Sequence, residues 1–203
     1  MSLNRRTTLF GMALSFAASP AFAQTTSPVR IRGTIDAVKN GTVVLKTRSG
    51  DERSVKLGDK VTYAWVVPTP ISAVKSGAFI GTAAINEPDG TLKALEIHVF
   101  PEAMRGSGEG HRGWDLGQNS SMTNGTVGAV TQTDGRTLHL SYKGGEKIVH
   151  VPPGTPIVTF EPGSADAILK PGDHVIVTAQ QGNDGSLTAT SIRGGKDGMV
   201  PPM

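Results

Sequence analysis

The chain has 203 residues, with 20 Lys and Arg against 17 Asp and Glu and a formal net charge of +3. Arg5 and Arg6 lie in the first 23 residues, which hold no acid, so the rest carries 18 basic and 17 acidic side chains. No basic block remains that would hold a phosphate backbone, which argues against nucleic acid as a partner. The sequence has no Cys, which excludes disulfides, thiolate zinc sites and a cysteine nucleophile.

The first 23 residues have the pattern of a secretory signal peptide. The paired arginines precede an apolar run at 9–18, and Ala21-Phe22-Ala23 supplies the small residues of a cleavage site. The apolar run is short for a membrane span, and no later run approaches that length. We therefore predict export to the periplasm, cleavage after Ala23 and no transmembrane segment in the mature chain. The arginine pair also resembles a twin-arginine signal, so the general and twin-arginine routes both stay open.

The mature chain contains two copies of one pattern. Residues 76–98 align without gaps to residues 171–193, at a constant offset of 95 residues. Near the start of the copies, Gly33-Thr34-Ile35 corresponds to Gly125-Thr126-Val127. A gapless register of this length indicates a duplication. We predict a first β-barrel repeat at 30–98, an inter-repeat loop at 99–122, a second β-barrel repeat at 123–193 and a flexible tail at 194–203.

Each repeat has the pattern of five short strands. Residues 30–37 alternate between polar and apolar, which is typical of a half-buried strand. Hairpin turns are indicated by Asn40-Gly41, Asp89-Gly90, Asp134-Gly135 and Asp184-Gly185. A short helix-like patch that ends in Gly, at 70–77 and at 165–172, lies between the third and fourth strands. We predict an all-β protein of two tandem OB-like small antiparallel β-barrels, each with one short helix, joined by a Gly-rich loop. A split β-sandwich is the alternative.

Three motifs resemble a widespread family of bacterial exported domains. They are the opening G-T-I-x-x-V at 33–38, the strand motif K-x-G-D-x-V-x-V at 170–177, and the ending D-G-x-L-x-A-x-x-I at 89–97 and 184–192. The family is named only as a domain of unknown function and often occurs in tandem. The first copy departs from the strand motif, with Ser76-Gly77-Ala78-Phe79 in its place. The resemblance implies a small β-barrel fold and no reaction, because the family has none assigned.

The inter-repeat segment, residues 99–122, has no counterpart after the second repeat. A structureless connection of this length is uncommon unless it is functional or disordered. An aromatic face, a guanidinium fork and a carboxylate lie together in Arg112, Trp114 and Asp115, a group that suits recognition of a ligand. With Glu109 and His111 they form the candidate ligand-binding set. The alternatives are that Trp114 packs as a plug between the barrels, or that the segment is a disordered linker.

A metal hypothesis rests on a mixed imidazole and thioether set, which suits copper. The set consists of His98, Met104, His111 and Met122. Their spacings match no rigid ligand motif, and the alternative is that His98 lies on the surface at a strand end while Met104 fills a gap in packing. The usual catalytic motifs are absent from the sequence, so we predict no catalytic residues and no cofactor, with copper as the alternative.

The sequence therefore predicts a periplasmic, non-enzymatic binding or scaffold protein whose ligand is an unknown protein or small molecule. The alternative is a periplasmic copper-handling protein that uses the segment 98–122. The sequence specifies neither the ligand nor the oligomeric state.

Overall fold

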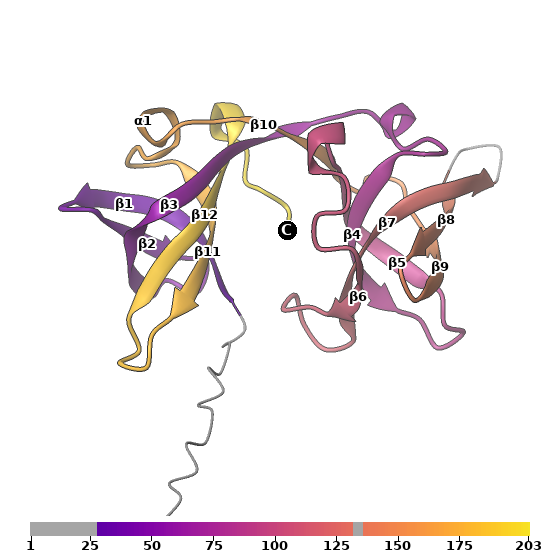
Figure 1. The fold of residues 1–203 in the computed structure, drawn as a ribbon, viewed down its shortest axis with the longest axis horizontal. Coiled ribbons are helices and arrows are strands. Elements are labelled where there is room, and N and C mark those ends of the chain that lie inside the picture. The colour runs from indigo at the N-terminus through magenta and orange to yellow at the C-terminus, as the bar shows by residue number, and fades with distance from the viewer. Residues whose placement is uncertain (1–27, 132–135) are drawn as a thin grey trace, which may run out of the picture.

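The computed structural model describes residues 28–131 and 136–203, and these form strands with very little helix (Figure 1). The predicted signal peptide and the Asp134-Gly135 turn lie outside the described residues. Within the described part of the chain, no helix has the length and apolar character needed to cross a membrane. The prediction of an all-β protein with a small, closed sheet is confirmed.

Five strands close a first ring of backbone pairings. The antiparallel meander of this ring consists of β1 (Val29–Lys39), β2 (Thr42–Thr47) and β3 (Glu52–Pro68). The hairpin of β11 (His174–Gln181) and β12 (Leu187–Gly195) completes it. β11 pairs with β1, and β12 pairs in parallel with β3. We call this set the first ring.

The second ring is built in the same way from five other strands. Its meander consists of β7 (Ser120–Thr131), β8 (Thr137–Tyr142) and β9 (Gly145–His150). Its hairpin consists of β4 (Phe79–Asn86) and β5 (Leu92–Val99), which pair with β7 and, in parallel, with β9. The short elements are η1 (Ile71–Ala73), η2 (Glu102–Met104), β6 (Gly110–Gly113), α1 (Ala165–Ile168) and η3 (Lys196–Gly198).

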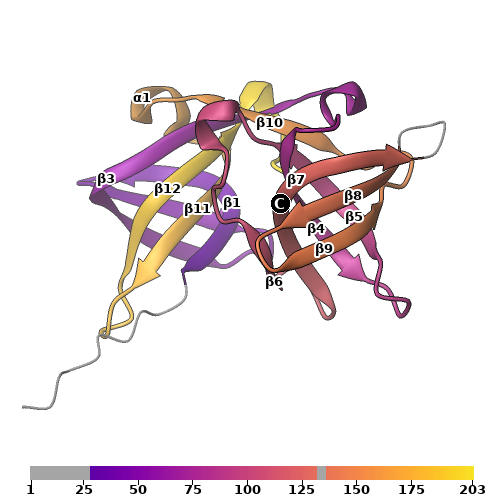
Figure 2. The same ribbon diagram turned by 45° about the vertical axis from the view of Figure 1, so that its right-hand side comes forward.

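Each ring contains strands from both sequence repeats, because the repeats exchange their C-terminal hairpins. The meander of the first repeat closes with β11 and β12, and the meander of the second closes with β4 and β5. The chain crosses between the rings along β3 and β10 (Ile157–Pro162), which pair antiparallel at the top of Figure 1. The repeats predicted at 30–98 and 123–193 therefore do not each enclose a ring of their own. Figure 2 shows the same two-lobed arrangement from another side.

The strand register preserves the sequence duplication. Gly33 pairs with Val175 in the first ring, and Gly125 pairs with Ile80 in the second. A Cβ on either glycine would press against a carbonyl oxygen of the next strand, that of Lys46 or of Ser141. Corresponding residues of the two repeats thus occupy corresponding places in opposite rings.

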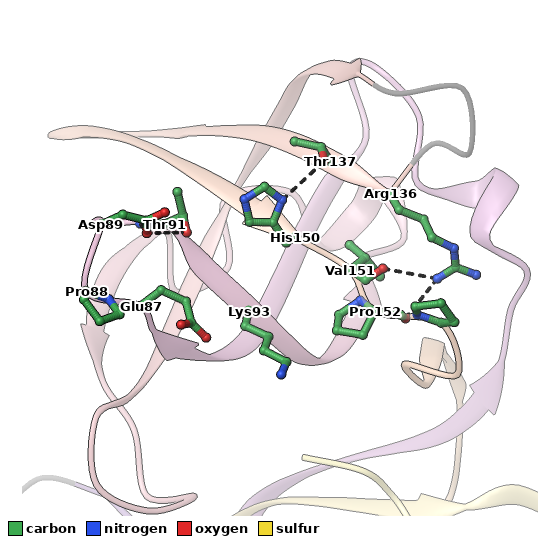
Figure 3. A pocket seen from close by; sticks show the side chains of 11 residues that line it. Glu87, Pro88, Asp89, Thr91, Lys93, Arg136, Thr137, His150, Val151 and Pro152 are labelled. Atoms are coloured by element: carbon green, nitrogen blue, oxygen red, sulfur yellow. Dashed lines mark hydrogen bonds between the residues drawn. The ribbon is translucent and has the colours of Figure 1, made fainter.

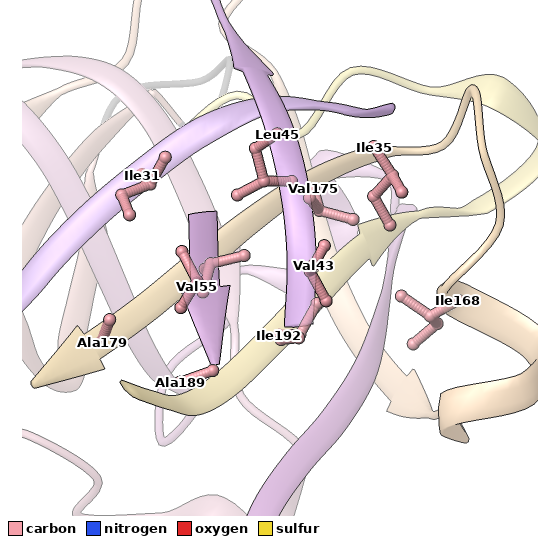
Figure 4. Packing of buried hydrophobic residues seen from close by; sticks show 11 residues of the cluster. Ile31, Ile35, Val43, Leu45, Val55, Ile168, Val175, Ala179, Ala189 and Ile192 are labelled. Carbon is pink, nitrogen blue, oxygen red and sulfur yellow. The ribbon is translucent and has the colours of Figure 1, made fainter. Parts of the chain in front are cut away.

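Each ring has its own apolar core, to which both repeats contribute. In the first ring, Val43 from β2 and Ile192 from β12 are fully buried in one cluster, shown in Figure 4. In the second ring, Leu138 from β8 and Ile97 from β5 are fully buried together. Burying one such side chain contributes about 1.5–3 kcal/mol, so the exchanged hairpins are held by core packing as well as by backbone pairing.

A third apolar cluster lies between the rings and includes the C-terminal residue. Met203 is only 3% exposed and belongs to a cluster with Phe79, Phe100 and Phe160. Its backbone oxygen accepts a hydrogen bond from Nε of Arg32 at 2.7 Å. The segment expected to be a flexible tail, 194–203, is therefore packed, and its end lies between the rings in both views (Figures 1 and 2). The sequence showed its apolar residues but not the surface that covers them.

Candidate ligand-binding site

A cavity of about 240 Å³ lies where the two rings face each other, and we call it the seam cavity. Its volume is that of about eight water molecules in the liquid. Four cations line it: Arg30, Arg32, Arg112 and Arg193. Five of its lining residues are apolar or aromatic: Phe100, Trp114, Met122, Ile176 and Met203. The rest are polar or small: His98, Ser107, Gly108, Asn124, Thr178 and Ser191.

Strand alternation explains why arginines reach the seam. Successive side chains of a strand point to opposite faces, so a buried residue turns its neighbours outward. Ile31 on β1 is buried in the first core, which sends Arg30 and Arg32 to the outer face. Ile192 on β12 is buried in the same core, which sends Arg193 outward as well. The seam cavity is therefore formed by the outer faces of the rings, not by their interiors.

The duplication makes the two walls comparable residue by residue. Arg193 on β12 and His98 on β5 are corresponding positions, and both line the cavity. Arg32 precedes Gly33, and Asn124 precedes the matching Gly125. The first ring thus contributes guanidinium groups where the second contributes an imidazole and an amide. Three of the four arginines of the cavity, Arg30, Arg32 and Arg193, thus come from the first ring, and Arg112 comes from β6 on the side of the second ring.

The inter-repeat segment spans the seam and is fixed to the first ring. β6 pairs with β7 of the second ring, and Trp114 follows β6 directly. The guanidinium of Arg30 lies 3.8 Å from the centroid of the Trp114 ring, and that of Arg112 lies 5.6 Å from it. The Asp115 carboxylate accepts hydrogen bonds from both terminal nitrogens of Arg32, at 3.0 and 2.7 Å. These stacking and bidentate contacts hold the segment against β1 of the first ring, beside the cavity.

Two buried polar atoms of the cavity residues have no hydrogen-bond partner among the described residues. They are Nε1 of Trp114 and Oδ1 of Asn124. The Nδ2 group of Asn124 donates to the carbonyl of Ser107 at 2.9 Å, which fixes the amide in place. A buried donor or acceptor without a partner costs about 1–3 kcal/mol. Two residues that line the cavity therefore carry one donor and one acceptor that the described protein groups leave unused.

Two of the four arginines also lack a protein acceptor within the described residues. Burial is the main cause that lowers the pKa of Arg30 and also that of Arg193. The charge of Glu96 raises the pKa of Arg193 in part, and the charge of Arg30 lowers it further. The Arg193 guanidinium lies 4.5 Å from the centroid of the Phe160 ring. By contrast, Arg32 is paired with Asp115, and Arg112 donates to the carbonyl of Gly108 at 2.8 Å. Arg30 and Arg193 are thus the two cations whose N–H groups donate no hydrogen bond to the described protein groups.

A buried carboxylate supports the opposite wall. Glu96 is fully buried, and its Oε1 lies 3.1 Å from Nδ1 of His98 and accepts a hydrogen bond from the backbone N–H of Ala83 at 3.1 Å. His98 is only 3% exposed and packs edge-on against Phe100, with ring centroids 4.7 Å apart. The alternative that His98 is a surface residue at a strand end is wrong, because Glu96 and the rings of Phe100 and Phe160 pack around it.

Of the five predicted ligand-binding residues, Arg112 and Trp114 line the seam cavity and Asp115 holds one of its arginines. The other two anchor the segment to the second ring. Glu109 accepts a hydrogen bond from the backbone N–H of Lys143 at 2.9 Å. His111 lies with Nδ1 2.8 Å from Oγ1 of Thr123 and stacks on Tyr142.

The four predicted copper ligands do not come together as one set. His98 and Met122 line the seam cavity, whereas Met104 and His111 are not among its lining residues. Met104 packs against the cluster between the rings. In the described ranges, no three His, Asp or Glu side chains are grouped as a metal would require.

Sequence reasoning missed Arg30, Arg32, Arg193 and Asn124. The alternation of β1 does predict that Arg30 and Arg32 face outward, but an outward face is ordinarily solvated. Only the exchange of hairpins brings β1, β7 and β12 to a common seam. A lone Arg at 193 carries no pattern that distinguishes it from a surface residue.

A larger pocket of about 600 Å³ lies at the edge of the second ring (Figure 3). Several of its polar groups bond to their neighbours. Asp89 accepts from the backbone and hydroxyl of Thr91, at 2.9 and 2.7 Å. Nδ1 of His150 lies 3.3 Å from the Thr137 hydroxyl, and Arg136 donates to the carbonyl of Pro152 at 2.9 Å. None of the buried unpartnered atoms of the described residues belongs to this pocket, whereas two belong to residues of the seam cavity, which is therefore the stronger candidate site.

Comparison with known families finds a match in the second repeat. Residues 127–193 match the sequence model of a family described as Domain of unknown function (DUF5666). No curated protein and no solved structure matches the chain. In the structure the matched residues run from β7 to β12 and supply strands to both rings. The predicted resemblance is confirmed: the second repeat is similar to a family that is named only as a domain of unknown function.

Proposed function

We propose that this protein is exported to the periplasm and acts there as a non-enzymatic binding protein, with the seam cavity as its ligand site. The observation that carries the proposal is the pair of unpartnered buried atoms, Trp114 Nε1 and Asn124 Oδ1, on residues that line one cavity. Ligand pockets combine apolar walls with a few placed polar groups, and the seam cavity has this composition. Export rests on the signal-peptide pattern of the first 23 residues.

The finer fold assignment is part of the proposal. We assign both rings as OB-like barrels, each made of five strands with a short helical element before the exchanged hairpin. In support, α1 precedes β11 and η1 precedes β4. Ile168 of α1 is fully buried in the core of the first ring. The exchange places two small barrels, each marginal at this size alone, in one folding unit.

Closing the cavity tests the assignment of the site. Ser191 lines the cavity from β12, so Ser191→Phe fills it without removing a charge. We expect a ligand found by a thermal-shift screen to raise the melting temperature of the wild type and not that of Ser191→Phe. Ser54→Phe, on an exposed position of β3, is the matched control and keeps the ligand response. A ligand whose effect survives Ser191→Phe unchanged would place the site elsewhere.

Copper handling is the second candidate, favoured only by the presence of His98 and Met122 in the seam cavity. Against it, four arginines line the same cavity and repel a cation. We expect titration with Cu(I), Cu(II) and Zn(II) to show no stoichiometric uptake. Tight one-to-one uptake that His98→Ala with His111→Ala abolishes would establish the metal function instead.

A further inference from the structure

The seam cavity concentrates positive charge that the protein neutralises only in part. Four guanidinium groups line it, while Asp115 pairs with Arg32 and is itself 40% exposed. Another carboxyl group that acts on these cations is Glu96, which is fully buried, contacts His98 and raises the pKa of Arg193. A cluster of cations around a cavity raises the local concentration of anions and speeds their association. The charge balance therefore favours an anionic occupant.

Arg30 and Arg193 are poised to bind such an occupant. Each guanidinium lies against an aromatic ring, Arg30 at Trp114 and Arg193 at Phe160. A guanidinium stacked by its face keeps its in-plane N–H groups available for a carboxylate or phosphate. Within the described residues, neither Arg has a hydrogen-bond acceptor, and the charge of Arg30 is one of the causes that lower the pKa of Arg193, after burial. Two neighbouring cations without an acceptor are stabilised by an oxyanion placed between them.

The remaining walls indicate that the anion is organic. Phe100, Ile176 and Met203 give the cavity an apolar side. Asn124 offers a buried carbonyl oxygen that needs a donor, such as a hydroxyl or an amide of the ligand. The volume of about 240 Å³ is below the usual range for drug-sized ligands, so the occupant is a small metabolite-sized molecule.

We infer that the seam cavity binds a small organic anion, whose carboxylate or phosphate group lies between Arg30 and Arg193 and whose apolar part lies against Phe100, Ile176 and Met203. This inference rests on the proposed function and specifies its ligand class. Phosphate and carboxylate share the chemistry that a guanidinium pair recognises, and the test separates them.

The test uses Trp114 as its reporter. The chain has two Trp, so Trp65→Phe leaves Trp114 as the sole indole fluorophore. Phenyl phosphate, benzoate, inorganic phosphate and neutral benzyl alcohol are titrated at constant ionic strength. We expect one or both aromatic anions to change the Trp114 emission at lower concentration than inorganic phosphate, and benzyl alcohol to have no effect. The ratio of the two aromatic affinities separates a phosphate site from a carboxylate site.

Charge variants then assign the effect to the two arginines. Arg30→Gln and Arg193→Gln are each expected to weaken binding about tenfold or more, since a charge-assisted hydrogen bond is lost. Arg53→Gln removes the same charge from an exposed site outside the seam cavity and is expected to leave affinity unchanged. The melting temperature of each ligand-free variant shows that it folds. Arg193→Lys keeps the positive charge but lacks the planar N–H donors of a guanidinium, so this variant is expected to bind the anion with intermediate affinity.

The outcomes separate this inference from the proposed function. Equal binding of benzyl alcohol, or unchanged affinity in both Arg→Gln variants, overturns the anion assignment and leaves the seam as the site. No response to any anion at millimolar concentration also overturns the anion assignment. A response to anions that persists in Ser191→Phe shows that the site is not the seam cavity, and both proposals fail.

Discussion

Gly81 is the position where the seam is most sensitive to one added methyl group. It lies on β4 opposite Asn124 of β7 and His98 of β5. A Cβ at Gly81 would overlap the His98 ring and would lie 2.5 Å from Oδ1 of Asn124. Both of these side chains are buried and hydrogen-bonded, so neither moves freely. The corresponding position of the first ring holds Ile176, which shows that the backbone there accepts a large residue.

We expect Gly81→Ala to destabilise the protein by about 2–3 kcal/mol, the upper part of the usual cost of overpacking, because the added Cβ meets two buried side chains. Removing the His98 ring opens the space, so the same change in a His98→Ala background costs about 1 kcal/mol or less. The coupling energy of the double-mutant cycle is then at least about 1 kcal/mol. Urea denaturation of the four proteins, followed by circular dichroism, measures it.

A matched glycine on a strand provides the control. A Cβ at Gly128 of β7 has its nearest neighbour at 3.6 Å, an ordinary contact. We expect Gly128→Ala to change stability by less than about 0.5 kcal/mol, as for most surface substitutions. If Gly81→Ala and His98→Ala are additive within about 0.5 kcal/mol, the two residues do not share a tightly packed wall and this description of the seam is wrong.

Three further predictions follow from the packing and the charges. Ile97 and Ile192 are fully buried at corresponding positions, and changing either to Ala is expected to lower the free energy of unfolding by about 2–5 kcal/mol. In calorimetry, each variant is expected to shift one common unfolding transition. Two separate transitions would show that the rings unfold independently. Met203→Ala is expected to cost about 2 kcal/mol in urea denaturation, since it removes a buried side chain, and a neutral effect would contradict the packed C-terminus. Burial lowers the pKa of His111 from 6.5, so the stability it contributes is present above pH 6.5 and is lost as the pH falls. His111→Gln should flatten that part of the stability profile, and an unchanged slope would contradict the assignment.

The local structure was largely predictable because short motifs encode it. Asn40-Gly41 was expected to form the first hairpin, and both residues have positive φ, 50° and 69°, as a tight hairpin turn requires. The apolar alternation of β1 correctly placed Ile31 and Ile35 in the core. These features depend on neighbours within a few residues, so the sequence alone contains the information.

The exchange of hairpins was not predictable for a physical reason. Ile97 and Ile192 are identical residues at corresponding positions, as are Ala94 and Ala189. A meander therefore finds nearly the same core contacts in the hairpin of its own repeat as in the hairpin of the other. Local preference does not distinguish the two closures. The difference lies in the path of the chain along β3 and β10, which pair with each other across the rings.

The site was only partly predictable because it depends on that exchange. The sequence indicated Arg112, Trp114 and Asp115 as a recognition group, and their partners turn out to be Arg30 and Arg32 on β1. The two alternatives of plug and recognition loop are not exclusive here. The segment closes the seam with Trp114 and Asp115, and at the same time it forms one wall of the cavity.

The central claim is that the seam between the exchanged rings is a ligand site, and the indole N–H of Trp114 reports on it most directly. This group is buried without a partner among the described residues. In a ¹H–¹⁵N spectrum, Trp114→Phe identifies its resonance among the two indole signals. We predict that phenyl phosphate shifts the Trp114 indole and the backbone amides of Arg30 and Arg193, and leaves the Trp65 indole in place. Shifts confined to the pocket around His150, or no shift of the Trp114 indole at saturation, would contradict the account.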